Sequence, residues 1–256
     1  MSPVDPNAVD LNADVGEGYG RWSLGDDDAL MPIITSANVA CGFHAGDPSI
    51  IRRTCVAAVA HDVAIGAQVS YPDLAGFGRR FIDIDPVELA DAVLYQIGAL
   101  QALAQVAGGR VLYVKPHGAL YNAIVHHEAQ AHAVAGAIAA HGGGLWLLGL
   151  PDSAIQVAAQ ASGVPFVAEG FADRSYTAAG TLTPRSQPGA LLTDPAAVAA
   201  QTEYLVGRGV GSICVHGDTP GAPTLAAAVR STLERLGVGP ARFVPKRKSG
   251  IIFCHC

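Results

Sequence analysis

The sequence predicts a single α/β barrel of about seven parallel strands with helices between them. Short apolar or β-branched runs alternate along the chain with longer Ala-rich stretches, which is the pattern of repeated βα units. The length of 256 residues suits one large domain, and the balance of 50% hydrophobic and 15% charged residues suits strands covered by helices. A closed or nearly closed barrel is favoured over an open doubly wound sheet, which composition alone does not exclude.

Seven strands are expected, each a short apolar run bounded by turn or loop residues. They are placed at residues 8–12, 33–39, 64–69, 110–115, 144–148, 165–168 and 210–215. Helices are expected between them, at residues 48–61, 86–108, 128–141, 153–162, 195–208 and 220–236. Several helices begin with Asp-Pro or Pro, which suits a first helical turn, and Asp47 and Asp194 are the expected N-caps.

The chain shows no internal boundary. No linker rich in Pro, Gly or Ser and no internal repeat divides it, so residues 1–256 are expected to form one domain. Residues 242–256 differ in character, with a basic run at 246–248, and are expected to be a tail or an edge strand. A metal hook made by Cys254, His255 and Cys256 is the weaker alternative.

Charge and cysteine usage exclude several classes of partner. A formal net charge of −6 gives no reason to expect binding to nucleic acid. The five cysteines are odd in number and lack CxxC spacing, which favours reduced thiols. The sequence has no secretory signal and no run of about 20 apolar residues, so we expect a soluble cytoplasmic protein without membrane contact.

The first strand carries polar residues on one face. Because side chains alternate along a strand, Asp10, Asn12 and Asp14 share a face, and Glu17 follows in a Gly-rich turn. Inward-facing carboxylates must be satisfied by hydrogen bonds, a cation or a ligand, which favours a functional interpretation. The alternative is an acidic loop in which Asp14 or Glu17 caps the turn.

Polar residues also follow the later strands, where functional groups collect in βα barrels. Two histidines stand next to glycines at strand ends, and a catalytic or binding role competes with a structural one for each. For Arg174 and Arg185, the alternative to a role in the site is that each is an ordinary surface charge. The candidates from these later strands are Asn38, His44, Lys115, His117, Tyr121, Arg174, Arg185 and His216. Phosphate-loop, HExxH and GxSxG motifs are all missing from the sequence.

Five ordered motifs resemble those of the LamB/YcsF family, whose members are the A subunits of 5-oxoprolinase. They are DLNADVGEG, SANVACGFHAGD, KPHGALYN, FADRSY with TPRSQPGAL, and CVHGD, and they extend from about Asp10 to Asp218. The resemblance implies a deacetylase-like β/α barrel that works with two partners, the B and C subunits. It also implies cleavage of 5-oxoproline to glutamate coupled to hydrolysis of ATP, with Mg²⁺ accompanying the nucleotide.

The motifs and the resemblance together assign site roles. Catalytic roles are expected for Asp14, His44, His117, Lys115, Asp10 and Glu17. Substrate-binding roles are expected for Asn12, Asn38, Tyr121, Arg174, Arg185 and His216. Our mechanistic hypothesis makes Asp14 or a neighbouring carboxylate the general base on water, with the two early histidines orienting or protonating the amide and Lys115 or Arg174 stabilising negative charge.

One residue departs from the family pattern. Many members carry His-Pro before Ser-Tyr-Pro-Asp, whereas this chain has Gln68 and Val69 there. An amide oxygen is a weaker ligand for transition metals than imidazole, so a metal-free mechanism or a different ligand set is favoured. ATP is expected either at the barrel mouth or on a partner subunit.

Two alternatives to the ATP-coupled hypothesis remain open. One is a metal-dependent amidohydrolase or sugar deacetylase acting without ATP. The other is a non-catalytic subunit that holds the substrate for a partner.

Overall fold

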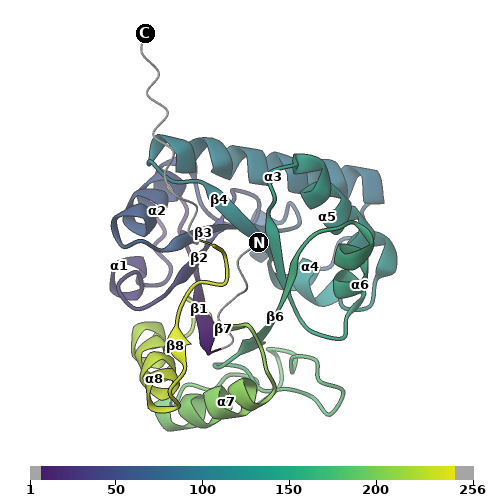
Figure 1. Ribbon diagram of the computed structural model, residues 1–256. Helices are drawn as coiled ribbons and strands as arrows, with labels where there is room; N and C mark the ends of the chain where they lie inside the picture. The colour runs from purple at the N-terminus through teal and green to yellow at the C-terminus, as the bar shows by residue number, and fades with distance from the viewer. Residues whose placement is uncertain (1–6, 246–256) are drawn as a thin grey trace.

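The computed structural model describes residues 7–245, and within them seven parallel strands close into a barrel (Figure 1). Closure follows from the strand order, because β1 pairs with β2 on one side and with β7 on the other. The strands are β1 (Ala8–Val15), β2 (Ser36–Ala40), β3 (Ala64–Val69), β4 (Val111–Pro116), β5 (Trp146–Gly149), β6 (Phe166–Phe171) and β7 (Ser212–Val215). The predicted single α/β barrel is confirmed.

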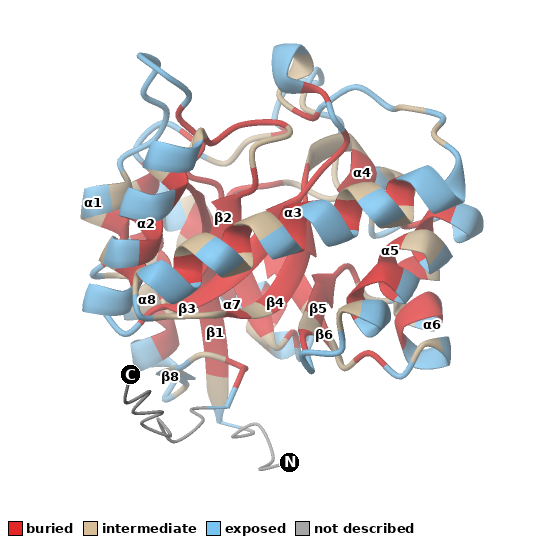
Figure 2. Ribbon diagram, turned by 90° about the horizontal axis from the view of Figure 1, so that it is seen from above, coloured by how far each residue is buried: buried red, intermediate tan, exposed pale blue. Residues whose placement is uncertain are grey.

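Helices surround the barrel and turn their exposed faces outward (Figure 2). The six expected helices are α2 (Pro48–Ala60), α3 (Pro86–Val106), α5 (Glu128–His141), α6 (Ala154–Ala161), α7 (Pro195–Gly207) and α8 (Ala222–Arg235). Three short helical elements were not predicted, namely α1 (Asp27–Leu30), α4 (Gly118–Ala123) and the 3₁₀ turn η1 (Leu74–Gly76). They are too short to show a helical repeat in the sequence.

The expected helix caps are present. The Asp47 carboxylate accepts hydrogen bonds from the backbone amides of Ser49 and Ile50, and Asp194 accepts one from Ala197. Proline occupies the first turn of both helices, where its missing N–H leaves no hydrogen bond unmade. Both predicted N-caps are confirmed.

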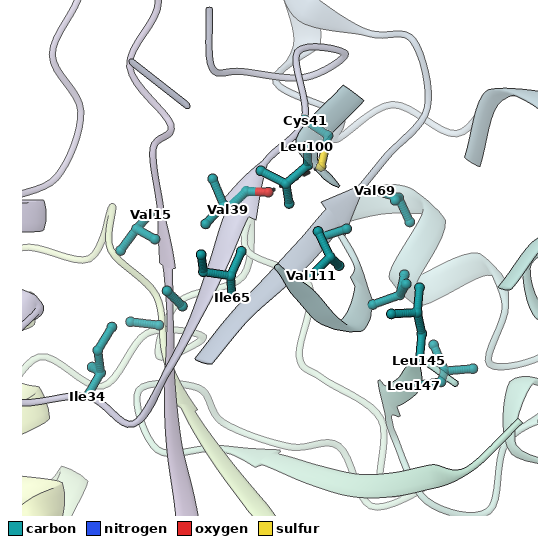
Figure 3. Packing of buried hydrophobic residues seen from close by; sticks show 14 of the residues in the cluster. Val15, Ile34, Val39, Cys41, Ile65, Val69, Leu100, Val111, Leu145 and Leu147 are labelled. Atoms are coloured by element: carbon teal, nitrogen blue, oxygen red, sulfur yellow. Dashed lines mark hydrogen bonds between the residues drawn. The ribbon is translucent and has the colours of Figure 1, made fainter. Parts of the chain in front are cut away.

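The apolar core lies between the barrel wall and the helices. Leu11, Ala13 and Val15 of β1 point into it and are at most 1% exposed. Figure 3 shows members of this core from several elements, among them Val39 of β2 and Leu100 of α3. Full burial of one such leucine stabilises the fold by about 1.5–3 kcal/mol. The alternate positions of β1 are left to face the barrel interior.

Part of the expected C-terminal tail belongs to the fold. Strand β8 (Gly239–Pro240) pairs with the start of β1, and Phe243 and Val244 are buried. The Phe243 ring packs edge to face against Tyr113 and lies 6.1 Å from Trp146. Apolar packing therefore holds residues 242–245 of the expected tail or edge strand against the barrel. The basic run and the Cys-His-Cys hook lie outside the described residues.

The described part of the chain contains no helix long and apolar enough to cross a membrane. Cys41, Cys55 and Cys214, the cysteines among the described residues, are buried free thiols.

Candidate active site

The barrel interior is filled by polar side chains in layers along β1. Near the amino-terminal end of β1, the Asp10 carboxylate accepts hydrogen bonds from the hydroxyls of Thr35 and Ser36 at 2.6 Å each and from the hydroxyl of Ser212 at 2.5 Å. Burial raises the pKa of Asp10 to about 6, an effect that these hydrogen bonds only partly oppose. Asp10 is fully buried.

In the next layer, the side-chain amides of Asn12 and Asn38 are hydrogen-bonded to each other. Asn12 donates to the Ser212 hydroxyl at 2.8 Å, and Asn38 donates to Asn12 Oδ1 at 2.7 Å and to Asp14 Oδ1 at 2.8 Å. The Tyr113 hydroxyl donates to Asn38 Oδ1 at 2.7 Å. These contacts fix the position of the Asp14 carboxylate.

A buried ion-pair network surrounds Lys115. Its Nζ lies 3.4 Å from Asp14 Oδ1, 3.2 Å from Glu169 Oε2 and 2.9 Å from Cys214 Sγ. Burial alone would raise the pKa of Asp14, but the Lys115 ammonium, the nearby histidines and the hydrogen bond from Asn38 together outweigh burial and hold that pKa well below its usual range. Asp14 is therefore an ionised carboxylate at neutral pH, and its low pKa makes it a weak base.

Glu17, His44 and His117 form a second buried cluster. The two imidazoles stack with their centroids 3.9 Å apart and an interplanar angle of 12°. Gln68 bridges them, with Oε1 at 3.2 Å from His44 Nε2 and Nε2 at 3.0 Å from His117 Nδ1. Burial lowers the pKa of His44 to about 4 and that of His117 well below its usual value, so both rings are neutral at neutral pH.

A loop covers this cluster at close range. Gly78, with φ of +65°, passes so close to the side chains of Ser70, His117 and His44 that a Cβ atom would collide with them. Glycine is required here both by the left-handed backbone and by the contact. Burial, followed by the nearby Asp14 charge, raises the pKa of Glu17 well above its usual value.

His216 and Asp173 form a dyad after β7 and β6. The Asp173 carboxylate lies 3.0 Å from His216 Nδ1 and also accepts from the His216 backbone amide and the Thr219 hydroxyl. Although burial alone would raise the pKa of Asp173, His216 and these hydrogen bonds lower it. An ionised Asp173 keeps the proton on Nδ1, which leaves Nε2 as an acceptor.

These groups meet at a cavity of about 600 Å³ at the carboxyl ends of the strands. Its lining includes Asp14, Arg79, Lys115, His117, Tyr121, Phe171, Arg174, Arg185 and His216. Arg79 and Arg185 both pair with Asp218, and Arg174 donates to the backbone oxygens of Ala190 and Thr183. The three guanidinium groups carry three positive charges, and among the residues that the structure describes only the Asp218 carboxylate pairs with them. The part of the cavity that they line therefore favours binding of an anion.

The structure separates the predicted site residues into two groups. Seven line the cavity, namely Asp14, Lys115, His117, Tyr121, Arg174, Arg185 and His216. The other five, Asp10, Asn12, Glu17, Asn38 and His44, are buried outside that lining. Asn12 and Asn38 contact it through hydrogen bonds to Lys115 and Asp14, and His44 stacks on His117. Glu17 lies 3.6 Å from His117, whereas Asp10 is bonded to hydroxyls that do not line the cavity. The predicted convergence of the first strand and the later histidines is thus observed, while the individual roles stay predictions.

Two residues with functional positions were missing from the predicted set. Arg79 reaches the cavity from the loop after β3, and the doubled arginine that follows Gly78 was the only signal for it. Asp173 stands next to the predicted Arg174, but its role depends on His216, which is 43 residues away in sequence. Sequence spacing does not reveal such a pairing.

Comparison with known proteins places the chain in a family. The model of the LamB/YcsF family matches residues 9–247. A Streptomyces coelicolor protein, named as the A subunit of 5-oxoprolinase, is 55% identical over 248 residues, which cover 92% of this chain and 99% of the relative. A Kocuria rhizophila protein of the same name is 56% identical, covering 90% of this chain and 96% of the relative.

A solved structure agrees with the sequence comparison. The lactam utilization protein of Thermus thermophilus superposes with a TM-score of 0.86 and 41% identity, covering 91% of this chain and 99% of that one. The chain therefore belongs to the LamB/YcsF family.

Proposed function

We propose that this chain opens the lactam ring of 5-oxoproline to give L-glutamate, as one subunit of a cytoplasmic, ATP-dependent 5-oxoprolinase. The names of its close relatives and of its structural neighbour support this substrate class. The observation that carries the proposal is a shared cavity: ionised Asp14, the His216–Asp173 dyad and the arginine side all face it.

The substrate has features that match this cavity. 5-Oxoproline is small and carries one carboxylate beside its lactam, so a guanidinium is a suitable partner for it. Arg185 and Arg174 supply that charge at one side. Tyr121 and Phe171 also line the cavity, and their packed rings present apolar surface to the five-membered ring.

His216 is the group best suited to move the proton. Its Nε2 accepts a proton from water as the water attacks the lactam carbon, and then returns it to the ring nitrogen as the C–N bond breaks. Asp14, too weakly basic for this step, orients the water as a fixed anion. This revises the hypothesis that a carboxylate is the general base.

Tyr121 is placed to stabilise the carbonyl oxygen. Its buried hydroxyl lines the cavity and has no hydrogen-bond partner among the described residues. Burial raises the pKa of Tyr121 well above its usual value, so the hydroxyl keeps its proton and can donate a hydrogen bond to the lactam oxygen.

Coupling to ATP belongs to the complex in this proposal. A lactam is a stable amide, and phosphorylation of its oxygen activates the carbonyl carbon for attack. Cleavage of the C–N bond then leaves an acyl phosphate, which a second water hydrolyses to glutamate and inorganic phosphate. This chain has no phosphate-loop motif, so we assign transfer of the phosphoryl group, with Mg²⁺, to the assembly with the B and C subunits.

The test is reconstitution with the two partner subunits, measuring glutamate formed from 5-oxoproline with and without ATP. We expect glutamate only when ATP and all three subunits are present. A complex that releases no glutamate, or releases it equally fast without ATP, contradicts the proposal. Activity of this chain alone, independent of ATP and lost to chelators, would instead favour a metal-dependent amidohydrolase, for which the Glu17, His44 and His117 cluster is the supporting observation.

A further inference from the structure

Glu17, His44 and His117 place three donor atoms at the spacing of a metal site. Glu17 Oε1 lies 3.6 Å from His44 Nε2 and 3.6 Å from His117 Nδ1, and the three atoms are all within 4.8 Å of one another. Two ligands that each lie about 2.1 Å from one tetrahedral ion are about 3.4 Å apart. The two separations from Glu17 are too long for hydrogen bonds and close to that ligand-to-ligand distance. The two imidazoles are stacked only 12° from parallel, so they must tilt toward each other for both nitrogens to point at one ion.

The carboxylate oxygen in this cluster has no other partner. Glu17 is 6% exposed, and its Oε1 makes no hydrogen bond within residues 7–245. A buried carboxyl oxygen without a partner is costly. A cation held jointly with the two imidazole nitrogens would satisfy it.

The tautomer of His117 suits a ligand. Its Nε2 lies 3.0 Å from the backbone oxygen of Phe77 and must donate to it, because a carbonyl oxygen only accepts. The proton on Nε2 leaves a lone pair on Nδ1, the atom that faces Glu17. A backbone carbonyl that fixes the outer nitrogen is the usual support of a metal-binding histidine.

The remaining two side chains can adapt to an ion. His44 Nδ1 has no hydrogen-bond partner in the described part of the chain, so the proton of this ring can move there and free Nε2. Gln68 contacts both ligand nitrogens through its amide. A turn of that amide would release the nitrogens and offer Oε1 as a fourth, weaker ligand.

We propose that Glu17 Oε1, His44 Nε2 and His117 Nδ1 bind one divalent first-row transition ion of the zinc, cobalt or manganese class. Two imidazoles and one carboxylate favour such an ion, whereas Mg²⁺ and Ca²⁺ take mainly oxygen ligands. His117 also lines the cavity, so the ion lies beside the proposed lactam site, where a bound ion can act as a Lewis acid. The ion-binding proposal is independent of the identity of the lactam.

The test uses the full chain, stripped with a chelator and titrated with Co²⁺, Zn²⁺, Mn²⁺ or Mg²⁺ in separate calorimetric experiments. We expect one equivalent of Co²⁺ to bind and to produce visible ligand-field absorption, Zn²⁺ to displace it, and millimolar Mg²⁺ to leave it in place. No lactam, nucleotide or partner subunit is present, so failure to bind metal is distinguishable from failure to open the lactam.

Variants locate the ion. Glu17→Gln and His117→Gln should each weaken Co²⁺ binding at least about 10-fold, the lower end of losses seen on changing metal-site residues. Glu169→Gln alters another buried carboxyl of the barrel interior, outside the cluster, and should bind Co²⁺ like the unchanged chain. Circular dichroism establishes that each variant is folded. An unchanged chain that binds no ion, or folded Glu17 and His117 variants that bind as tightly as it does, would overturn the proposal.

Discussion

Asp173 holds His216 from two sides: one carboxylate oxygen lies 3.0 Å from Nδ1 of the ring, and the other accepts the backbone amide of the same residue at 3.1 Å. The carboxylate is fully buried, whereas the ring lines the cavity. The pair therefore fixes both the position of the imidazole and the nitrogen that carries its proton.

Replacing Asp173 by Asn should lower kcat of the reconstituted enzyme about 100-fold or more, the size of a general acid–base contribution, and leave KM little changed. The carboxamide no longer enforces the Nδ1–H tautomer. Thr219→Val is the matched control, because it removes another hydrogen bond to Asp173 without contacting the ring through its side chain. Equal losses of kcat in the two variants would show that Asp173 has only a structural role.

Replacing Asp14 by Asn should nearly abolish ATP-coupled lactam opening while the fold is retained. The amide oxygen can still accept from Asn38, and Glu169 still pairs with Lys115. The variant removes the negative charge that orients water in the cavity. Steady-state rates and circular dichroism measure the two effects, and full activity in a folded variant would eliminate this role of Asp14.

Sequence reasoning predicted the polar barrel interior because two rules combine. Strand alternation places Asp10, Asn12 and Asp14 on one face, and closure of a parallel barrel brings that face to the strand ends that carry the histidines. The rules do not give depth along the barrel, so Asp10 and Asp14 received the same predicted role. Depth separates them: Asp14 lines the cavity, and Asp10 is bonded to three hydroxyls outside its lining.

The loop contribution to the site could not be predicted in the same way. Arg79 reaches the cavity because the loop after β3 folds back over the histidine pair, a path set by tertiary contacts of Gly78. No periodicity in the sequence encodes that path. The loop contains an ion pair between residues close in sequence, Arg80 and Asp73. That pair does not involve Arg79, the arginine that lines the cavity.

Replacing Arg185 by Met should raise KM for 5-oxoproline about 10-fold or more and change kcat much less. A hydrogen bond to a charged group contributes about 1.5–3 kcal/mol, and the proposed contact with the substrate carboxylate is present in both ground and transition states. Asp218 keeps its pairing with Arg79. Arg230→Met, which alters an arginine bonded to Ile33 and Glu234, is the control and should leave KM unchanged. A fall in kcat at constant KM would contradict a binding role for Arg185.

Replacing Lys115 by Met should lower the free energy of unfolding by about 3–5 kcal/mol, because two buried carboxylates lose their cation. Adding Glu169→Gln to this variant should recover part of the loss, since it removes one of the uncompensated charges. Urea denaturation at neutral pH measures both differences. If the Lys115→Met variant is as stable as the unchanged chain, the ion-pair network does not depend on the Lys115 ammonium.

Asp10 should make the fold less stable as pH rises from about 4 to about 6. Burial raises the pKa of Asp10 in the folded protein from 3.8 to about 6. Below pH 3.8 the carboxyl is protonated in both states, and above pH 6 it is ionised in both, so neither range adds a slope. Between them the unfolded chain releases the proton and the folded chain retains it, and rising pH therefore favours unfolding. Each unit of difference between the folded and unfolded pKa changes the free energy of unfolding by about 1.36 kcal/mol, which gives a total of about 3 kcal/mol.

The slope from Asp10 can be isolated with Asp10→Asn, which does not titrate. The three hydroxyls around this position can rotate to donate to the amide oxygen or accept from its nitrogen, so the variant should fold. Urea denaturation of both proteins across pH 4 to 7 cancels the contributions of all other groups. We expect the stability of the unchanged chain relative to the variant to fall by about 3 kcal/mol between pH 4 and 6 and then to level off. Parallel stability curves would mean that the Asp10 carboxyl titrates alike in the folded and unfolded states, and that its burial imposes no penalty on the charged form.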